Sequence, residues 1–198
     1  MMKTTKLLLL SSFILACLGG VSVLIFSYYS HREVDRSGLT HARKINWPPG
    51  FKPAESAIFL HNEINIKAPP QLVWDIFIKA GKCPEWYSKA EGIRLLNAPD
   101  GKLSQSSVFI WGHEGKFTSA VKEFDPPTMI AWLEQADHQK ITAYCAWMII
   151  PTQDGCKVVS NQTQNGPKTT MGKSFAFNVA AKHTRDRLAR LKQQAENM

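Results

Sequence analysis

The segment from Ile58 to Tyr87 constrains the fold more than any other part of the chain. It opens with alternating residues, in which one side of the chain carries Ile58, Leu60, Ile64 and Ile66. Alternation with period two, rich in β-branched residues, predicts a strand with one buried face. Pro69 and Pro70 then end the strand, because proline donates no hydrogen bond to a neighbouring strand.

A short amphipathic helix is expected directly after these prolines. Pro70 suits the first position of a helix, where its missing N–H is not needed. Apolar residues then recur at helical spacing, namely Leu72, Val73, Ile76 and Phe77. Gly81 ends this helix, and the residues from Pro84 to Tyr87 predict the start of a second short helix.

The chain after Trp86 consists of short strand patterns separated by turn residues. The expected strands run over Ile93–Leu96, Ser107–Trp111, Phe117–Phe124, Met129–Glu134, Ile141–Ile150 and Lys157–Gln164. Strands that follow one another through tight turns favour an antiparallel meander. From Thr169 to Ala195, apolar residues recur every three or four positions, which predicts a long helix with one apolar stripe.

The strand, the proline break, the short helix and Pro84-Glu85-Trp86 after it resemble the N-terminal signature of the SRPBCC superfamily. Later patterns resemble its polyketide cyclase members, namely Glu123-Phe124-Asp125-Pro126-Pro127 before Ala131-Trp132, and Trp147-x-x-x-Pro151 before Asp154-Gly155. The resemblance covers about residues 58–195. It implies an α+β helix-grip fold, in which a curved antiparallel sheet wraps around a long C-terminal helix, with two short helices after the first strand.

In helix-grip domains a cavity opens between the sheet and the long helix, so the resemblance implies a site for a hydrophobic small molecule or lipid. We expect the ligand-binding residues to be Phe109, Trp111, Phe117, Ile130, Trp132, Cys145 and Trp147. Aromatic side chains on a curved sheet can form an apolar pocket with few polar groups. The alternative is that they fill the core, where large aromatic residues are common.

A cyclase or dehydratase-like enzyme would need an ionisable group inside this cavity. The candidates are His61, Glu63, His113, Glu114, His138, Tyr144 and His183. Alternation places His61 and Glu63 away from the apolar face, so both are expected in solvent, and Tyr144 is expected to point away from Trp147. Relatives of this type often carry histidine where this chain has Cys145. We therefore assign no catalytic residue, and keep the enzyme as the alternative function.

The histidines and cysteines predict neither a metal site nor a cofactor. No two histidines have the spacing of a recognised zinc pattern. The four cysteines form no C-x-x-C pair and are expected to be free thiols: Cys17, Cys83, Cys145 and Cys156.

The N-terminal part, residues 1–29, predicts a single transmembrane anchor. No residue from Leu7 to Tyr29 is charged, and a helix of this length spans the ~30 Å hydrocarbon core of a bilayer. A signal peptide or lipoprotein signal cleaved near Cys17 is the alternative. The short basic leader favours a signal anchor, with the globular part outside the cytoplasm. Residues 30–57 carry mixed charge and several prolines and are expected to be a linker, followed by the ligand-binding domain over 58–198.

The net charge of +8 permits attraction to anionic membranes or to nucleic acid. No motif that reads nucleic acid is present, so we expect no nucleic-acid partner. The cations of the C-terminal helix suit a solvated face near the negative end of the helix dipole, or docking onto anionic headgroups. A third possible function is a membrane-tethered interaction module whose core is filled.

Overall fold

The structure is a computed structural model that describes residues 44–80, 93–97, 100–111, 117–136, 141–166 and 170–198. The chain divides into two compact units, Met1–Ser37 and Gly38–Met198, and all described residues belong to the second. Among them, no helix has both the length and the apolar character needed to cross a membrane. The expected anchor over residues 1–29 and the expected second short helix after Pro84 lie outside the described residues.

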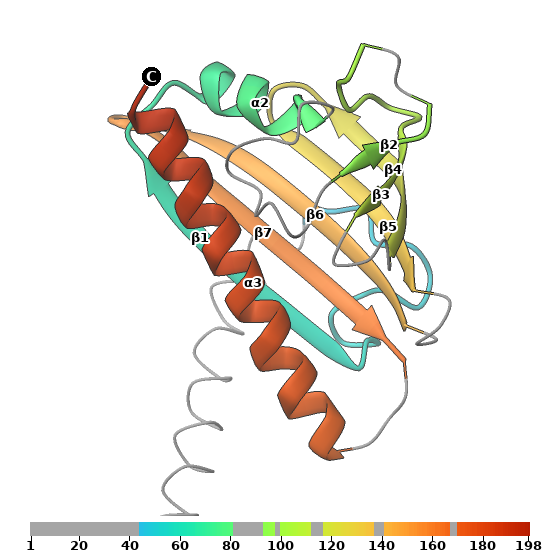
Figure 1. Cartoon of the computed structure of the whole chain (residues 1–198). Helices are drawn as coiled ribbons and strands as arrows, with labels where there is room; N and C mark the ends of the chain where they lie inside the picture. Colours follow the sequence, from blue (N-terminus) through green and yellow to red (C-terminus); the bar gives the residue numbers. More distant parts are fainter. Residues whose placement is uncertain (1–43, 81–92, 98–99, 112–116, 137–140, 167–169) are drawn as a thin grey trace, which may run out of the picture. The chain divides into compact units, whose positions relative to one another are not determined.

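One seven-stranded antiparallel sheet forms the body of the second unit (Figure 1). Its strands are β1 (Ile58–Ile66), β2 (Arg94–Leu95), β3 (Val108–Trp111), β4 (Phe117–Asp125), β5 (Met129–Ala136), β6 (Ile141–Thr152) and β7 (Gly155–Asn165). Their spatial order is β1-β7-β6-β5-β4-β3-β2. The expected meander is therefore confirmed from β2 to β7, and β1 pairs with the last strand.

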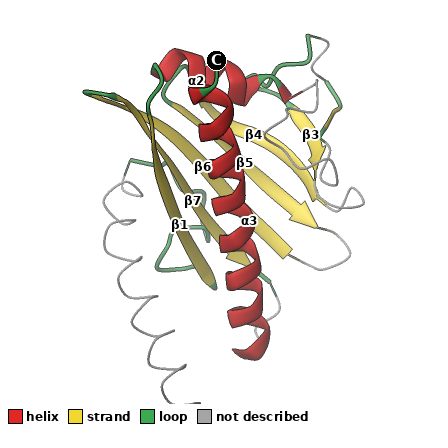
Figure 2. Cartoon of the chain, turned by 60° about the vertical axis from the view of Figure 1, so that its left-hand side comes forward, coloured by secondary structure: helices red, strands yellow, loops and turns green. Residues whose placement is uncertain are grey.

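Two described helices accompany the sheet, α2 (Pro70–Ile78) and α3 (Thr170–Glu196). Figures 1 and 2 show α3 running along one face of the sheet, with α2 near its C-terminal end, and α3 contacts β1. We call this face of the sheet the inner face. The apolar stripe of α3 is buried as predicted, at Ala181, Thr184, Leu188, Leu191 and Ala195.

The turn between β6 and β7 depends on a glycine. Gly155 has a φ of +144°, a conformation that residues with a Cβ rarely adopt. A Cβ on Gly155 would also collide with the carbonyl oxygen of Ile66 and the backbone nitrogen of Ala68. The end of β1 can therefore pass directly over this turn only because residue 155 has no side chain.

The opposite, outer face of the sheet is covered in part by residues 44–57. Ile45, Trp47 and Phe51 from this segment join an apolar cluster with Tyr144, Ala146, Met148 and Val159. The Tyr144 hydroxyl donates a hydrogen bond of 2.6 Å to Glu123, whose carboxylate also accepts one of 3.0 Å from the Asn46 amide. Tyr144 thus points away from Trp147, as expected.

Candidate functional site

The strand register places the predicted site residues together on the inner face. Phe109 pairs with Ser119, Ser119 with Glu134, and Glu134 with Ala143. Trp132 likewise pairs with Cys145, and Ile130 with Trp147. Residues directly opposite one another in antiparallel strands project from the same face. Five of the predicted residues are at most 7% exposed and belong to one cluster with Leu188 and Leu191 of α3: Phe109, Ile130, Trp132, Cys145 and Trp147.

The remaining two predicted residues lie at the β3–β4 end of this face. Phe117 is partly buried and packs against the same cluster. Trp111 pairs with Phe117 in the ladder, and its side chain lies outside the described part of the structure. The contact of all seven residues with a ligand stays a prediction.

The aromatic rings of the inner face pack closely near α2. The ring centroids of Phe77 and Trp147 are 5.0 Å apart, and those of Trp132 and Trp147 are 6.5 Å apart in a stacked arrangement. The side chains at this end leave no cavity that could hold a water molecule. They are Trp74, Phe77, Ile130, Trp147, Ile149, Val158 and Leu191. At the α2 end, the protein's own side chains therefore fill the space.

A buried carboxyl group, Glu134, lies further along the same face. Its side chain is 2% exposed, although glutamate is almost never fully buried unless it is paired. The indole Nε1–H of Trp132 donates to Glu134 Oε1 at 2.6 Å, and the thiol of Cys145 donates to the same oxygen at 3.1 Å. Oε2 accepts no hydrogen bond from any described residue. Trp132 and Cys145, two of the predicted ligand-binding residues, thus donate hydrogen bonds to Glu134, which is not among the predicted site residues.

Burial controls the protonation of this group. Loss of solvent raises the pKa of Glu134 from its usual 4.5 to about 7, against the opposing effects of the Trp132 and Cys145 hydrogen bonds and the charge of Arg187. Burial also raises the pKa of the Cys145 thiol, and the neighbouring Glu134 raises it further. Glu134 therefore changes protonation near neutral pH, while Cys145 stays a thiol.

Helix α3 supplies the cation that acts on this acid. Arg187 precedes Leu188, which is buried against the sheet, and its own Nε atom is buried. Its positive charge lowers the pKa of both Glu134 and Cys145. The acid on the sheet and the cation on the helix therefore belong to the two layers that face each other.

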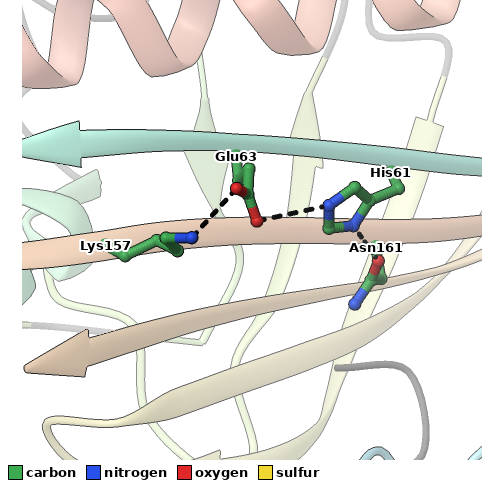
Figure 3. A network of polar contacts seen from close by, with 4 residues as sticks. All are labelled: His61, Glu63, Lys157 and Asn161. Carbon is green, nitrogen blue, oxygen red and sulfur yellow. Dashed lines mark hydrogen bonds and ion pairs between the residues drawn. The ribbon is translucent and has the colours of Figure 1, made fainter. Parts of the chain in front are cut away.

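A network of polar side chains lies on the outer face, on β1 and β7 (Figure 3). His61 Nδ1 is 2.8 Å from Asn161 Oδ1, and His61 Nε2 is 3.5 Å from Glu63 Oε2. The ammonium of Lys157 is 3.0 Å from Glu63 Oε1. Asn161 pairs with Ala146 of the outer cluster, so this network does not share a face with Glu134.

Our expectation that His61 is solvated is wrong, because its side chain is only 4% exposed and lies beside the fully buried Asn161. Glu63 is exposed as expected. The candidate His183 lies exposed on α3. His113, Glu114 and His138 lie outside the described residues. Cys145 and Cys156 are free thiols as predicted, whereas Cys17 and Cys83 fall outside the described ranges. Nowhere in the described part do histidine, cysteine and acidic residues gather in a metal-binding group.

The sequence contains a signal for Glu134 that our candidate list missed. Ile130, Trp132 and Glu134 follow one another at spacing two along a single strand. In a strand, residues at this spacing share a face. An acid in register with two large apolar residues therefore predicts an inward-pointing carboxyl.

The fold and this inner face define the class of protein. A curved antiparallel sheet around a long C-terminal helix, with a short helix after the first strand, is the helix-grip arrangement of the SRPBCC superfamily. Residues 67–193 match the family described as "Activator of Hsp90 ATPase homolog 1-like protein". The chain belongs to this family.

Solved structures show the same fold at low sequence identity. A hypothetical protein from Helicobacter pylori is 20% identical with a TM-score of 0.66, over 76% of this chain and 95% of that one. A protein from Mesorhizobium loti is 16% identical with a TM-score of 0.59, over 71% and 98% of the two chains. The di-domain ARO/CYC StfQ from the steffimycin biosynthetic pathway is 14% identical with a TM-score of 0.59, over 71% of this chain and 51% of its own. Comparison with curated proteins gave no match.

Proposed function

We propose that the domain binds a hydrophobic small molecule or lipid between the inner face of the sheet and α3. The observation that carries this proposal is the buried Glu134 carboxyl, held by hydrogen bonds from Trp132 and Cys145. A core needs no carboxyl for packing, and burying an ionisable group opposes folding. Ionisable groups with strongly shifted pKa values cluster at functional sites.

Apolar burial would supply most of the affinity, at roughly 25 cal/mol for each Å² of surface removed from water. Because the hollow near Trp74 is filled, the ligand enters by displacing side chains on the inner face. The bound ligand would change the surroundings of two tryptophans on this face, Trp132 and Trp147. Binding is therefore expected to change their fluorescence.

The test is mass spectrometry of small molecules that co-purify with the full chain and with two variants. Trp132→Ala removes a large part of the proposed wall, whereas Tyr144→Phe changes only a hydroxyl on the outer face. We expect a compound enriched with the wild-type chain and with Tyr144→Phe, and at least about fivefold depleted with Trp132→Ala, since truncation of a large aromatic residue at a contact costs more than about 1 kcal/mol. Equal and nearly empty extracts from all three proteins would contradict ligand binding.

The same carboxyl favours a second candidate function, catalysis of a cyclase or dehydratase-like reaction. A general acid or base works best when its pKa is close to the working pH, and the pKa of Glu134 is about 7. One solved structure with this fold is described as an ARO/CYC from a biosynthetic pathway, which agrees with such a role. Turnover of a bound compound that Glu134→Gln abolishes would distinguish this enzyme from a carrier.

We further propose that residues 1–29 anchor the domain in a membrane, with the globular part outside the cytoplasm. The uncharged run from Leu7 to Tyr29 and the basic leader before it support this arrangement. After alkaline washing of membranes, the full chain should stay in the pellet, and a version without residues 1–29 should be released. Release of the full chain would contradict anchoring, and a reporter fused after Met198 would test the orientation.

A further inference from the structure

The two carboxylate oxygens of Glu134 differ in their hydrogen bonds. Oε1 accepts two hydrogen bonds, and Oε2 accepts none from the described residues. We propose that the inner-face site selects a neutral, largely apolar molecule that carries a hydroxyl group, and that this hydroxyl donates a hydrogen bond to Oε2 of Glu134. This inference rests on the proposed function, and it names the chemical class of the ligand.

The hydrogen bonds of Glu134 leave a place for one more donor. Both donors on the protein side, Trp132 Nε1–H and the Cys145 thiol, bind Oε1. Oε2 accepts no hydrogen bond from the described residues, although Glu134 is only 2% exposed. A hydroxyl that donates to this oxygen would form a charge-assisted hydrogen bond with the carboxylate, so it would be favoured there over an apolar group.

The charges around Glu134 exclude a charged ligand. Arg187 acts on Glu134 from α3, and the Cys145 thiol faces it from β6. Ser119, opposite Glu134 on β4, carries no charge. The ionised carboxylate and the Arg187 cation largely offset each other, so a charged ligand group would gain little net attraction and would lose its hydration. A hydroxyl donates a hydrogen bond without adding a charge that either group opposes.

The walls around this oxygen favour a flat apolar body. The ring centroids of Phe109 and Trp132 are 5.8 Å apart in an edge-to-face arrangement. The hydrogen bond from Trp132 Nε1 to Glu134 fixes the indole beside the carboxyl group. In the proposed complex an aromatic alcohol would replace part of this packing, with its ring against Phe109 and Trp132 and its hydroxyl at Oε2.

The experiment compares three probes that differ in a single substituent: 2-naphthol, 2-methoxynaphthalene and 2-naphthoate. Each is titrated into the purified full chain and followed by tryptophan fluorescence and calorimetry. We expect 2-naphthol to bind about tenfold more tightly than 2-methoxynaphthalene, the usual effect of one hydrogen bond to a charged group. We expect 2-naphthoate to bind more weakly than both.

The pH dependence separates this hydrogen bond from general apolar attraction. The carboxylate of Glu134 is the better acceptor, and it forms above a pKa of about 7. The preference for 2-naphthol over the methyl ether should therefore be larger at pH 8 than at pH 6. The affinity for 2-methoxynaphthalene should change little between these two values.

Two matched variants complete the test. Glu134→Gln keeps the shape of the side chain but puts an amide NH₂ where Oε2 could accept, so the preference for 2-naphthol and its pH dependence should both disappear. Glu63→Gln makes the same change on the outer face and should leave both intact. Retained binding of 2-methoxynaphthalene shows that Glu134→Gln still folds.

The outcomes separate this inference from the proposed function. If the wild-type chain binds both neutral probes equally, or if Glu134→Gln keeps the preference, the hydroxyl contact is wrong while ligand binding stands. Tighter binding of 2-naphthoate would overturn the neutral class. If no probe binds to the wild-type chain, the inner face does not receive aromatic molecules, and both proposals fail for this ligand class.

Discussion

The surroundings of the Glu134 side chain determine its protonation state. An exposed glutamate is ionised at neutral pH, but here burial raises the pKa to about 7. Trp132 and Cys145 donate to one oxygen of the carboxylate and so favour the ionised form, as does the charge of Arg187. The protonation of Glu134 is therefore set by the balance between desolvation and three neighbours.

This balance predicts how stability depends on pH. Between pH 4.5 and about 7 the folded chain binds the Glu134 proton more tightly than the unfolded chain, so this group lowers the free energy of unfolding as pH rises. At about 1.4 kcal/mol per pKa unit, the full loss is roughly 3 kcal/mol. Urea unfolding at pH 5 and pH 8 should show most of this loss, about 2.5 kcal/mol, in the wild-type chain and not in Glu134→Gln.

The control for this prediction is Glu55→Gln, which changes an exposed glutamate of the segment before β1. Its free energy of unfolding should follow the wild-type pH dependence. An unchanged slope in Glu134→Gln would mean that this carboxyl titrates alike in the folded and unfolded chains.

At the level of elements, α3 covers the inner face through one stripe and leaves its other side in solvent. Leu188, Leu191 and Ala195 are buried against the sheet, while Arg185 and Arg190 are exposed. Leu191 also lines the filled hollow with Trp74 and Trp147. The helix therefore depends on a small number of apolar contacts that a single substitution can remove.

Leu191→Ala should lower the free energy of unfolding by about 2–5 kcal/mol, the usual range for truncating a buried leucine. Arg190→Ala, at the position just before Leu191, should change it by less than about 0.5 kcal/mol because its side chain is exposed. Chemical denaturation of both variants measures the difference. Equal effects would mean that α3 does not pack on the sheet through this stripe.

At the level of the whole molecule, the sequence predicts elements well because their periodicities are local. The change from period two to period 3.6 at Pro69 and Pro70 marks the end of β1 and the start of α2. Alternation also predicts that Trp147 and Tyr144 lie on opposite faces of β6, as they do.

Contacts between distant segments could not be predicted in this way. The burial of His61 depends on Asn161, which is 100 residues further along the chain. The shifted pKa of Glu134 depends on how deeply the assembled sheet and α3 bury its carboxyl, and on Arg187 from the final helix. Alternation alone gives the face on which such a residue lies, but not what covers it.

The segment over residues 44–57 has a practical consequence for work on the isolated domain. The first strand begins at Ile58, which makes it a natural place to shorten the chain. Yet Trp47 and Phe51 lie against the ring of Tyr144, with centroids 5.5 and 6.3 Å away. A fragment that starts at Ile58 would lack these side chains and would expose an apolar patch around Tyr144 to solvent. Exposed apolar patches promote self-association. A soluble fragment should therefore begin ahead of Ile45.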